Sequence, residues 1–303
     1  MPPDSSTPRS QWLPLLALAV LSICWGYTWV VAKMGLSHAG PFTFAFQRSL
    51  GGAAALFLAL IVTRRSLKIQ VPWSTFWLGV VQTGGFMLFQ TWALVEGGAG
   101  KTAVLIYTMP IWTLLLAWPI LGERLRGGQW AAAVCTVTGL ILVISPWDLH
   151  TSLFSKFLGV TAATVWAVGT VMMKRLRARV QVDLLNLTAW QVLIGTGFLL
   201  VVHLLTDERA TDWSHAYMAE LAFISVVSSA LGWFLWFYVL DWLPAWEASL
   251  SVLGIPVVAM AMSRMQLSEG FTALELGGIA LIGGGLGLLS LVSWLTARRA
   301  GKT

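Results

Sequence analysis

The sequence predicts an all-α integral membrane protein with ten transmembrane helices, arranged as two inverted five-helix repeats. Three observations predict this fold. Of 303 residues, 57% are hydrophobic and 11% are charged, against roughly 25% charged residues in soluble domains. The hydrophobic residues form ten runs that are long enough, or nearly long enough, to cross a bilayer. The second half of the chain also repeats residues of the first half in the same order.

Each predicted span is a run of about 20 mostly apolar residues, the length that an α-helix needs to cross the hydrocarbon core. The connections between spans are short, so we expect no separate nucleotide-binding or sensor domain in this chain. The first twelve residues are polar and rich in Pro and Ser, and we expect them to be disordered. The predicted spans are 13–35, 41–63, 74–95, 102–121, 128–145, 157–176, 184–205, 217–240, 247–266 and 273–295.

The basic residues predict the orientation of the chain. Thirteen of the 19 Lys and Arg residues fall on the side that holds both termini, and five fall on the other side. Because cytoplasmic loops carry an excess of Lys and Arg, both termini are expected in the cytoplasm. The net charge of +6 therefore reflects membrane flanks, and we expect no nucleic-acid partner.

The internal repeat divides the chain into residues 1–148 and residues 149–303. Each half has five spans, an odd number, so the two halves run through the membrane in opposite directions. Inverted repeats are typical of secondary transporters, which bind substrate near the midplane between the repeats. A shift of 146 residues aligns Val80-Val81 with Val226-Val227, Pro110 with Pro256, and Glu123 with Glu269, and a shift of 141 aligns Trp25 with Trp166.

Three motifs give the chain a resemblance to a known family. They are Trp25-Gly26 in the first span, Pro110 in the fourth span, and Gly-Glu-Arg-Leu at 122–125. In this order and spacing, the chain resembles the EamA family of the drug/metabolite transporter superfamily over nearly its whole length. The second half departs from the first of these motifs, because Trp166 is followed by Ala167, whereas Trp25 is followed by Gly26. The resemblance implies a bacterial inner-membrane carrier, often an exporter of amino acids or other metabolites.

Polar and aromatic side chains inside the spans are the candidate substrate contacts. Gln82 and Gln90 share one face of the third span, where they either join helices or line a cavity, and we favour Gln90 for the cavity. Trp25 and Trp166 lie deep in their spans, where each either packs between helices or forms a wall against substrate. The predicted substrate-binding residues are Trp25, Gln90, Tyr107, Thr108, Trp166, Ser229, Trp236 and Ser249.

Two prolines occupy matched positions in the fourth and ninth spans. Each removes a helix hydrogen bond and frees the carbonyl four residues earlier, which in lipid must face protein or a water-filled cavity. Pro110 and Pro256 are therefore either kinks that aid packing or hinges of an alternating-access motion.

Charged groups inside the spans are few. Arg48 is one of them, and it either has a functional role or extends toward the interface two turns away. Acidic residues are read as lying at span ends or in loops, which favours a neutral, zwitterionic or anionic substrate. Facilitated diffusion or exchange is then expected, or coupling through an end-of-span group such as Glu247.

We expect no cofactor and no metal site. The segment Gly97–Thr102 resembles a phosphate-binding loop but has Val95 where that motif requires Gly. Close small residues at 280–287 suit helix packing, within one chain or across a homodimer.

The predicted function is a secondary transporter that carries a small metabolite across the lipid bilayer. The expected substrate is an amino acid or a related compound, and the expected direction is export. The alternative is a translocator of lipid or lipid-linked sugar. A remote alternative is an intramembrane enzyme, which the sequence disfavours because no group of His, Asp, Glu or Cys residues in the spans could form a catalytic site.

Overall fold

The computed structural model describes residues 12–121, 127–144, 152–232, 235 and 254–300, and the regular elements among them are all helical. Helices are the expected outcome because lipid leaves each backbone N–H and C=O to be satisfied within its own segment. The elements are α1 Trp12–Gly35, α2 Pro41–Val62, α3 Pro72–Leu78, η1 Gly79–Gly85, α4 Phe86–Glu96, α5 Ala99–Ile106, α6 Met109–Leu121, α7 Gly128–Ile144, α8 Leu153–Arg177, α9 Leu184–Leu205, α10 His215–Ala222, η2 Phe223–Leu231, α13 Gly254–Leu267 and α14 Ala273–Ala300.

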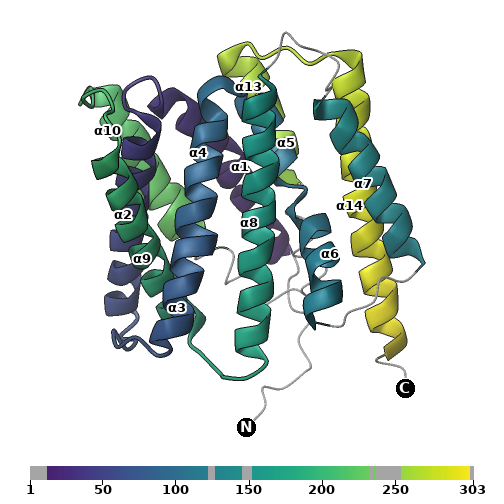
Figure 1. The fold of residues 1–303 in the computed structure, drawn as a ribbon, viewed down its shortest axis with the longest axis horizontal. Helices are drawn as coiled ribbons and strands as arrows, with labels where there is room; N and C mark the ends of the chain where they lie inside the picture. The colour runs from purple at the N-terminus through teal and green to yellow at the C-terminus, as the bar shows by residue number, and fades with distance from the viewer. Residues whose placement is uncertain (1–11, 122–126, 145–151, 233–234, 236–253, 301–303) are drawn as a thin grey trace.

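In the described residues these elements form ten spans that alternate in direction, as predicted (Figure 1). The third span combines α3, η1 and α4; the fourth combines α5 and α6; the eighth contains α10 and η2. Six of the spans are helices long and apolar enough to cross a membrane, and Gly128–Ile144 and Ala273–Leu289 are shorter apolar helices. The start of α1 and the end of α14 point to the same end of the bundle, at the bottom of Figure 1. We call this the N/C end and the opposite one the far end.

Two π-helical segments occupy equivalent places in the two halves. The first, η1, lies in the third span, and the second, η2, lies in the eighth span. The shift of 146 that aligns Val80-Val81 with Val226-Val227 carries residues 79–85 onto 225–231, which lie inside η2. Single π-helical turns inside α-helices are frequent at functional sites. The repeat seen in the sequence therefore coincides with a repeat in backbone geometry.

The last spans of the two halves, α7 and α14, pack closely against each other through glycine (Figure 1). A Cβ atom built on Gly139 would lie 2.5 Å from the carbonyl oxygen of Gly278. A Cβ on Gly285 would lie 2.9 Å from the carbonyl oxygen of Ala132. These glycines allow the two backbones to approach within one chain. Gly283 and Gly284 are exposed and have no such neighbour within 4 Å.

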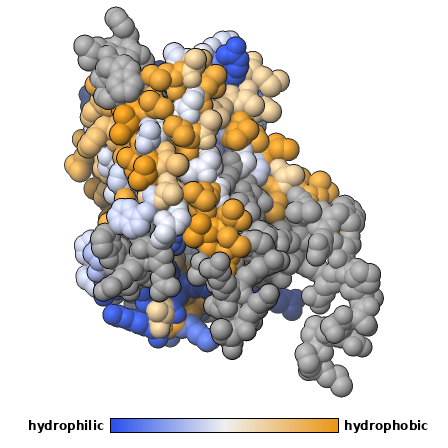
Figure 2. All heavy atoms as spheres, turned by 90° about the vertical axis from the view of Figure 1, so that its right-hand side faces the viewer, coloured by the Kyte–Doolittle hydropathy of each residue, from blue (hydrophilic) through white to orange (hydrophobic). Residues whose placement is uncertain are grey.

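The outer surface suits a lipid environment. Large side chains such as Leu58 (61% exposed) and Phe157 (67% exposed) project outward from the spans. Figure 2 shows hydrophobic residues over the middle of one face and hydrophilic residues at its bottom, which is the N/C end. Exposed basic residues of that end include Arg64, Lys174 and Arg175. The distribution is that of a multi-pass membrane protein.

Candidate functional site

A buried hydrophobic cluster with several aromatic members draws on both halves of the chain and extends to the far end. Its buried members include Trp29 of α1, Phe44 of α2, Phe86 of α4 and Tyr217 of α10, and we call it the central aromatic cluster. Two of the predicted site residues pack against it. Trp166 makes an edge-to-face contact with Phe86 at 4.7 Å between ring centroids, and Tyr107 lies 6.2 Å from Trp29.

The two glutamines of the third span differ in their surroundings. The Gln82 amide bonds to Gln191 of α9 and Thr170 of α8 at 3.3 and 3.4 Å. Gln90 is 5% exposed, and its Oε1 is buried without a hydrogen-bond partner. It lies on α4 one turn from Phe86, on the face that meets the central aromatic cluster. Gln82 thus links the third span to α8 and α9, whereas the Gln90 amide oxygen has no partner among the described residues.

Arg48 is buried beside the same cluster. Its side chain is 7% exposed, so it does not extend to the interface, and one of the two alternatives for this residue is excluded. The guanidinium carbon lies 5.8 Å from the centre of the Phe44 ring, one turn earlier on α2. Its Nη1 is buried without a hydrogen-bond partner. A buried cation in this state is costly and marks a place where a charged ligand group would be stabilised.

Three further predicted residues already have partners in the protein. The Trp25 indole donates to the carbonyl of Ser228 at 3.0 Å and so links α1 to η2. The Ser229 hydroxyl donates to the carbonyl of Ile224, five residues earlier, as the π-helix allows. Thr108 donates to the Leu105 carbonyl at 2.6 Å and accepts from Trp112 at 3.1 Å. These contacts hold helices and turns in place.

The fourth span is interrupted where a proline-induced kink was predicted. α5 ends at Ile106, and α6 begins at Met109, so Pro110 is the second residue of a new helix. Pro at this position lacks only an N–H that would be unpaired anyway. Pro256 is the third described residue of α13. Trp236, Glu247 and Ser249 lie outside the described residues.

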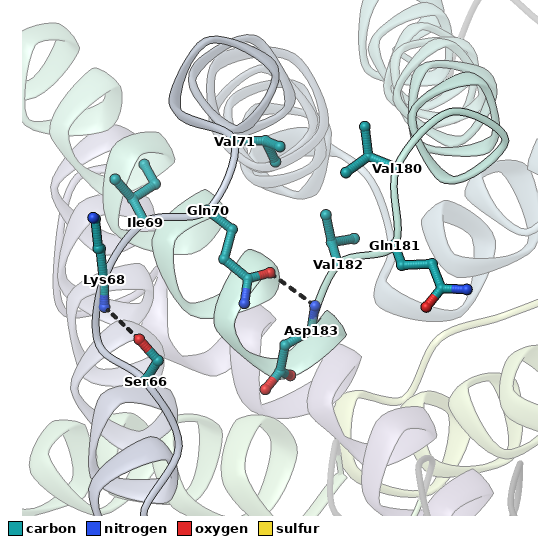
Figure 3. A pocket seen from close by; sticks show the side chains of 9 residues that line it. All are labelled: Ser66, Lys68, Ile69, Gln70, Val71, Val180, Gln181, Val182 and Asp183. Atoms are coloured by element: carbon teal, nitrogen blue, oxygen red, sulfur yellow. Dashed lines mark hydrogen bonds between the residues drawn. The ribbon is translucent and has the colours of Figure 1, made fainter.

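A hollow of about 390 Å³ lies at the N/C end, between the α2–α3 and α8–α9 connections (Figure 3). The Gln70 side chain accepts from the Asp183 amide at 2.9 Å across it (Figure 3). Arg65 also forms an ion pair with Asp183, at 2.9 Å, and Asn186 donates to the Ser66 carbonyl at 2.6 Å. We call these contacts the N/C latch.

A second hollow of about 300 Å³ lies at the far end, between the α1–α2 and α9–α10 connections. There Glu208 accepts from the backbone amides of Phe42 and Thr43 at 3.0 and 2.7 Å, and it also accepts from the Thr43 hydroxyl. His38 contacts Asp212 at 3.1 Å. We call these contacts the far-end latch. The inverted repeat maps the connections of one latch onto those of the other.

Two acidic residues near the starts of their spans are buried, whereas the sequence showed no sign of a buried acid. Glu275, in the first turn of α14, is 4% exposed and pairs with Lys101 of α5 at 2.6 Å. Glu220, on α10, is 7% exposed, and its buried Oε2 has no hydrogen-bond partner among the described residues. Tyr217 and Ile224, about one turn to either side of Glu220, are fully buried as well.

The segment that resembles a phosphate-binding loop is the start of a helix. Ala99 begins α5, and the amides of Ala99 and Gly100 donate to the Glu269 carboxylate at 2.5 and 3.1 Å. An acidic side chain of the chain itself thus occupies the place where an anion would bind. Among the described residues, no group of three His, Cys, Asp or Glu side chains could hold a metal ion.

Comparison with known proteins matches the chain to one family twice. The model of the EamA-like transporter family matches residues 12–145 and again residues 153–291. The chain is 29% identical to the uncharacterized transporter YoaV of Bacillus subtilis, over 88% of this chain and 93% of that protein. It is 27% identical to a probable amino-acid metabolite efflux pump of Escherichia coli, over 90% and 92% of the two chains. A crystal structure of another protein shares the fold, with a TM-score of 0.67 at 19% identity over 96% of this chain and 99% of that one.

Proposed function

Because this chain belongs to the EamA-like transporter family, we propose that it exports an amino acid or a related metabolite across the bacterial inner membrane by alternating access. The relatedness to a probable amino-acid metabolite efflux pump supports the substrate class. The excess of Lys and Arg at the N/C end supports a cytoplasmic location for both termini. The far end then faces the outside of the cell.

One observation carries the proposal: Arg48 and Gln90 each keep a buried polar atom that has no partner among the described residues, beside the central aromatic cluster. A guanidinium binds a carboxylate through two parallel hydrogen bonds, and an amide oxygen can accept from an ammonium group. A zwitterionic substrate would therefore satisfy both side chains. Tyr107 and Trp166 would provide walls for its apolar part.

We propose that residues 1–148 and 149–303 act as the two repeats of this transporter. The second repeat would contribute Ser229, Trp236 and Ser249 from its own spans. Pro110 and Pro256 remain the proposed hinges, and the interruption at Tyr107-Thr108 and the two π-helical segments add further points of flexibility. Release of one latch while the other holds would expose the centre to one side at a time.

Exchange of labelled amino acids by the purified protein in liposomes tests the proposal. Each of the twenty amino acids is loaded inside, and uptake of the same labelled compound is followed. We expect exchange of at least one amino acid by the wild type. Arg48→Gln and Gln90→Ala should each lower its rate about tenfold, because each loses one hydrogen-bonded contact worth about 1.4 kcal/mol to the bound substrate.

Gln82→Ala is the matched control, since it removes an amide from the same helix face that already has protein partners. It should lower the melting temperature and leave the exchange rate per folded protein unchanged. Wild-type protein that exchanges no amino acid would overturn the proposed substrate class. Movement of labelled lipid between the leaflets in that case would favour a lipid translocator.

A further inference from the structure

The Glu220 carboxyl group differs from the other buried acid, Glu275, and from the half-buried acids Glu208 and Glu269. Glu275 pairs with Lys101, Glu269 accepts from two amides of α5, and Glu208 accepts from two amides of α2. Each of these carboxylates is stabilised as an anion by its donors. The buried Oε2 of Glu220 has no donor among the described residues, so neither its charged nor its neutral form is fixed there by hydrogen bonds at that atom. Ionisable groups at such positions are typical of proton pathways in transporters.

The groups around Glu220 come from each element that packs against α10, namely α1, α2 and η2. The residues of η2 include no titratable side chain. On α2, Arg48 lies beside Phe44. On α1, Lys33 bonds to the carbonyls of Leu94 and Gly97 and so faces the end of α4. His38, which follows α1, has its ring near that of Tyr217, one turn before Glu220 on α10.

The remaining charged groups of the region are held in the far-end latch or face solvent. Arg209 donates to the carbonyls of Leu36 and Ala39. Glu208 is bonded to the start of α2. On α10 itself, His215 is exposed, and the Tyr217 hydroxyl donates to Gln47 of α2. Among these groups, His38 contacts α10 through the ring of Tyr217, and an imidazole can both accept and donate a proton.

His38 connects the buried acid to the solvent at the far end. Its Nδ1 lies 3.1 Å from Asp212, whose side chain is 67% exposed, and 3.3 Å from the hydroxyl of Ser214. The ring also lies 5.7 Å from that of Tyr217, one turn before Glu220 on α10. His38 therefore lies between the exposed Asp212 and the part of α10 that carries Tyr217 and, one turn later, the buried Glu220.

Protonation of Glu220 would act on the same helix that reaches the proposed substrate site. α10 continues directly into η2, where a Cβ atom built on Gly52 of α2 would lie 3.1 Å from the Ser229 hydroxyl. Gly52 is one turn from Arg48. An anionic Glu220 attracts a protonated His38 and favours the closed far-end latch, whereas a neutral Glu220 removes that attraction.

We propose that Glu220 is the proton-coupling residue of this transporter, and that it receives its proton from the far-end side through His38. This inference rests on the proposed export function. In one cycle, substrate leaves at the far end, Glu220 binds a proton from that side, and the reoriented protein releases the proton at the N/C end. The net reaction exchanges one outgoing substrate for one incoming proton, and no covalent bond to substrate is formed or broken.

The test separates coupling from transport in liposomes supplied with the twenty labelled amino acids. At equal pH, wild type and Glu220→Gln should both exchange labelled for unlabelled amino acid. With a pH gradient of one unit, wild type should accumulate label up to about tenfold, the limit for one-for-one exchange with protons. Glu220→Gln should accumulate none, and His38→Gln should accumulate it more slowly.

The controls are Glu96→Gln and His215→Gln, which replace an exposed acid and an exposed histidine of the far end and should behave as wild type. Accumulation that ignores the pH gradient in wild type, or that survives in Glu220→Gln, overturns the coupling proposal. Loss of both exchange and accumulation in Glu220→Gln, at an unchanged melting temperature, also overturns it and assigns Glu220 to substrate binding. If wild type exchanges no amino acid, the export proposal fails by itself.

A measurement without substrate keeps the coupling proposal testable in that case. The melting temperature of wild type is followed against pH in detergent, beside that of Glu220→Gln and, should that variant not fold, of His38→Gln. A step in the melting temperature of the wild type as the pH changes, absent from the substituted protein, supports the proposal that Glu220 and His38 exchange a proton. Identical profiles for wild type and variant overturn it.

Discussion

The two latches hold equivalent connections of the inverted repeat, but they are built from different chemistry. The N/C latch relies on the Arg65–Asp183 ion pair, whose side chains are 50% and 24% exposed, and on amide contacts such as that of Gln70. The far-end latch has the Glu208 carboxylate on the first turn of α2 and includes His38. The difference teaches that the fold repeats the position of the two sets of connections without repeating the side chains that join them.

The largest effect on stability is expected from Glu208, because it makes charge-assisted hydrogen bonds to two backbone amides and one hydroxyl. Glu208→Gln should lower the free energy of unfolding by about 2 kcal/mol, since the N-terminus of α2 loses an anion. Thermal or denaturant unfolding in mixed micelles measures it. Asp207→Asn, at an exposed neighbour, is the control, and equal losses in the two variants would contradict the assignment.

A smaller effect is expected from Asp183, which caps α9 through the amides of Leu185 and Asn186 at 2.9 and 3.4 Å. Asp183→Ala should cost about 1 kcal/mol through loss of this cap. Asp183→Asn keeps a capping side chain and removes only the partly exposed ion pair with Arg65, so its loss should stay below about 1 kcal/mol. Equal losses in the same unfolding experiment would show that the ion pair, rather than the cap, dominates the N/C latch.

The smallest effect on stability is expected from His38→Gln, which removes the 3.1 Å contact between the imidazole Nδ1 and Asp212. Because the Asp212 side chain is 67% exposed, the loss of unfolding free energy should stay below about 1 kcal/mol. Hydrogen exchange of residues 206–214 measures the local effect and should be faster in the variant. Residues 178–183 of the N/C latch should exchange at the same rate in both proteins. Equal exchange of residues 206–214 in the two proteins would contradict a role of His38 in the far-end latch.

Matched positions in the two halves could be recognised from sequence, but their local structure could not. Val80-Val81 and Val226-Val227 align, and the structure adds that both pairs lie in π-helical segments. Pro110 was identified as a point of irregularity, and it is the second residue of α6, which follows a full interruption of the span. A proline fixes its own backbone and restricts the residue before it, while the surrounding packing decides whether the helix bends or ends.

The pair Gln82 and Gln90 shows where the prediction of the candidate site reaches its limit. Helical periodicity places both amides on one face of the third span. Their difference depends on Gln191 and Thr170, which are about 90 to 110 residues away in the sequence and form hydrogen bonds with Gln82. Glu220 was assigned to a span end for the same reason, because its burial depends on groups of other helices.

The sequence by itself determined the membrane environment, the ten spans and the duplication, because these follow from the length, hydrophobicity and order of local segments. The tertiary structure alone decided which polar groups inside the spans have partners. It gave Gln82, Glu208 and Glu275 their donors or acceptors and left polar atoms of Arg48, Gln90 and Glu220 without any. The physical reason is that hydrogen bonds and ion pairs between helices join residues far apart in the chain, and no local pattern encodes them.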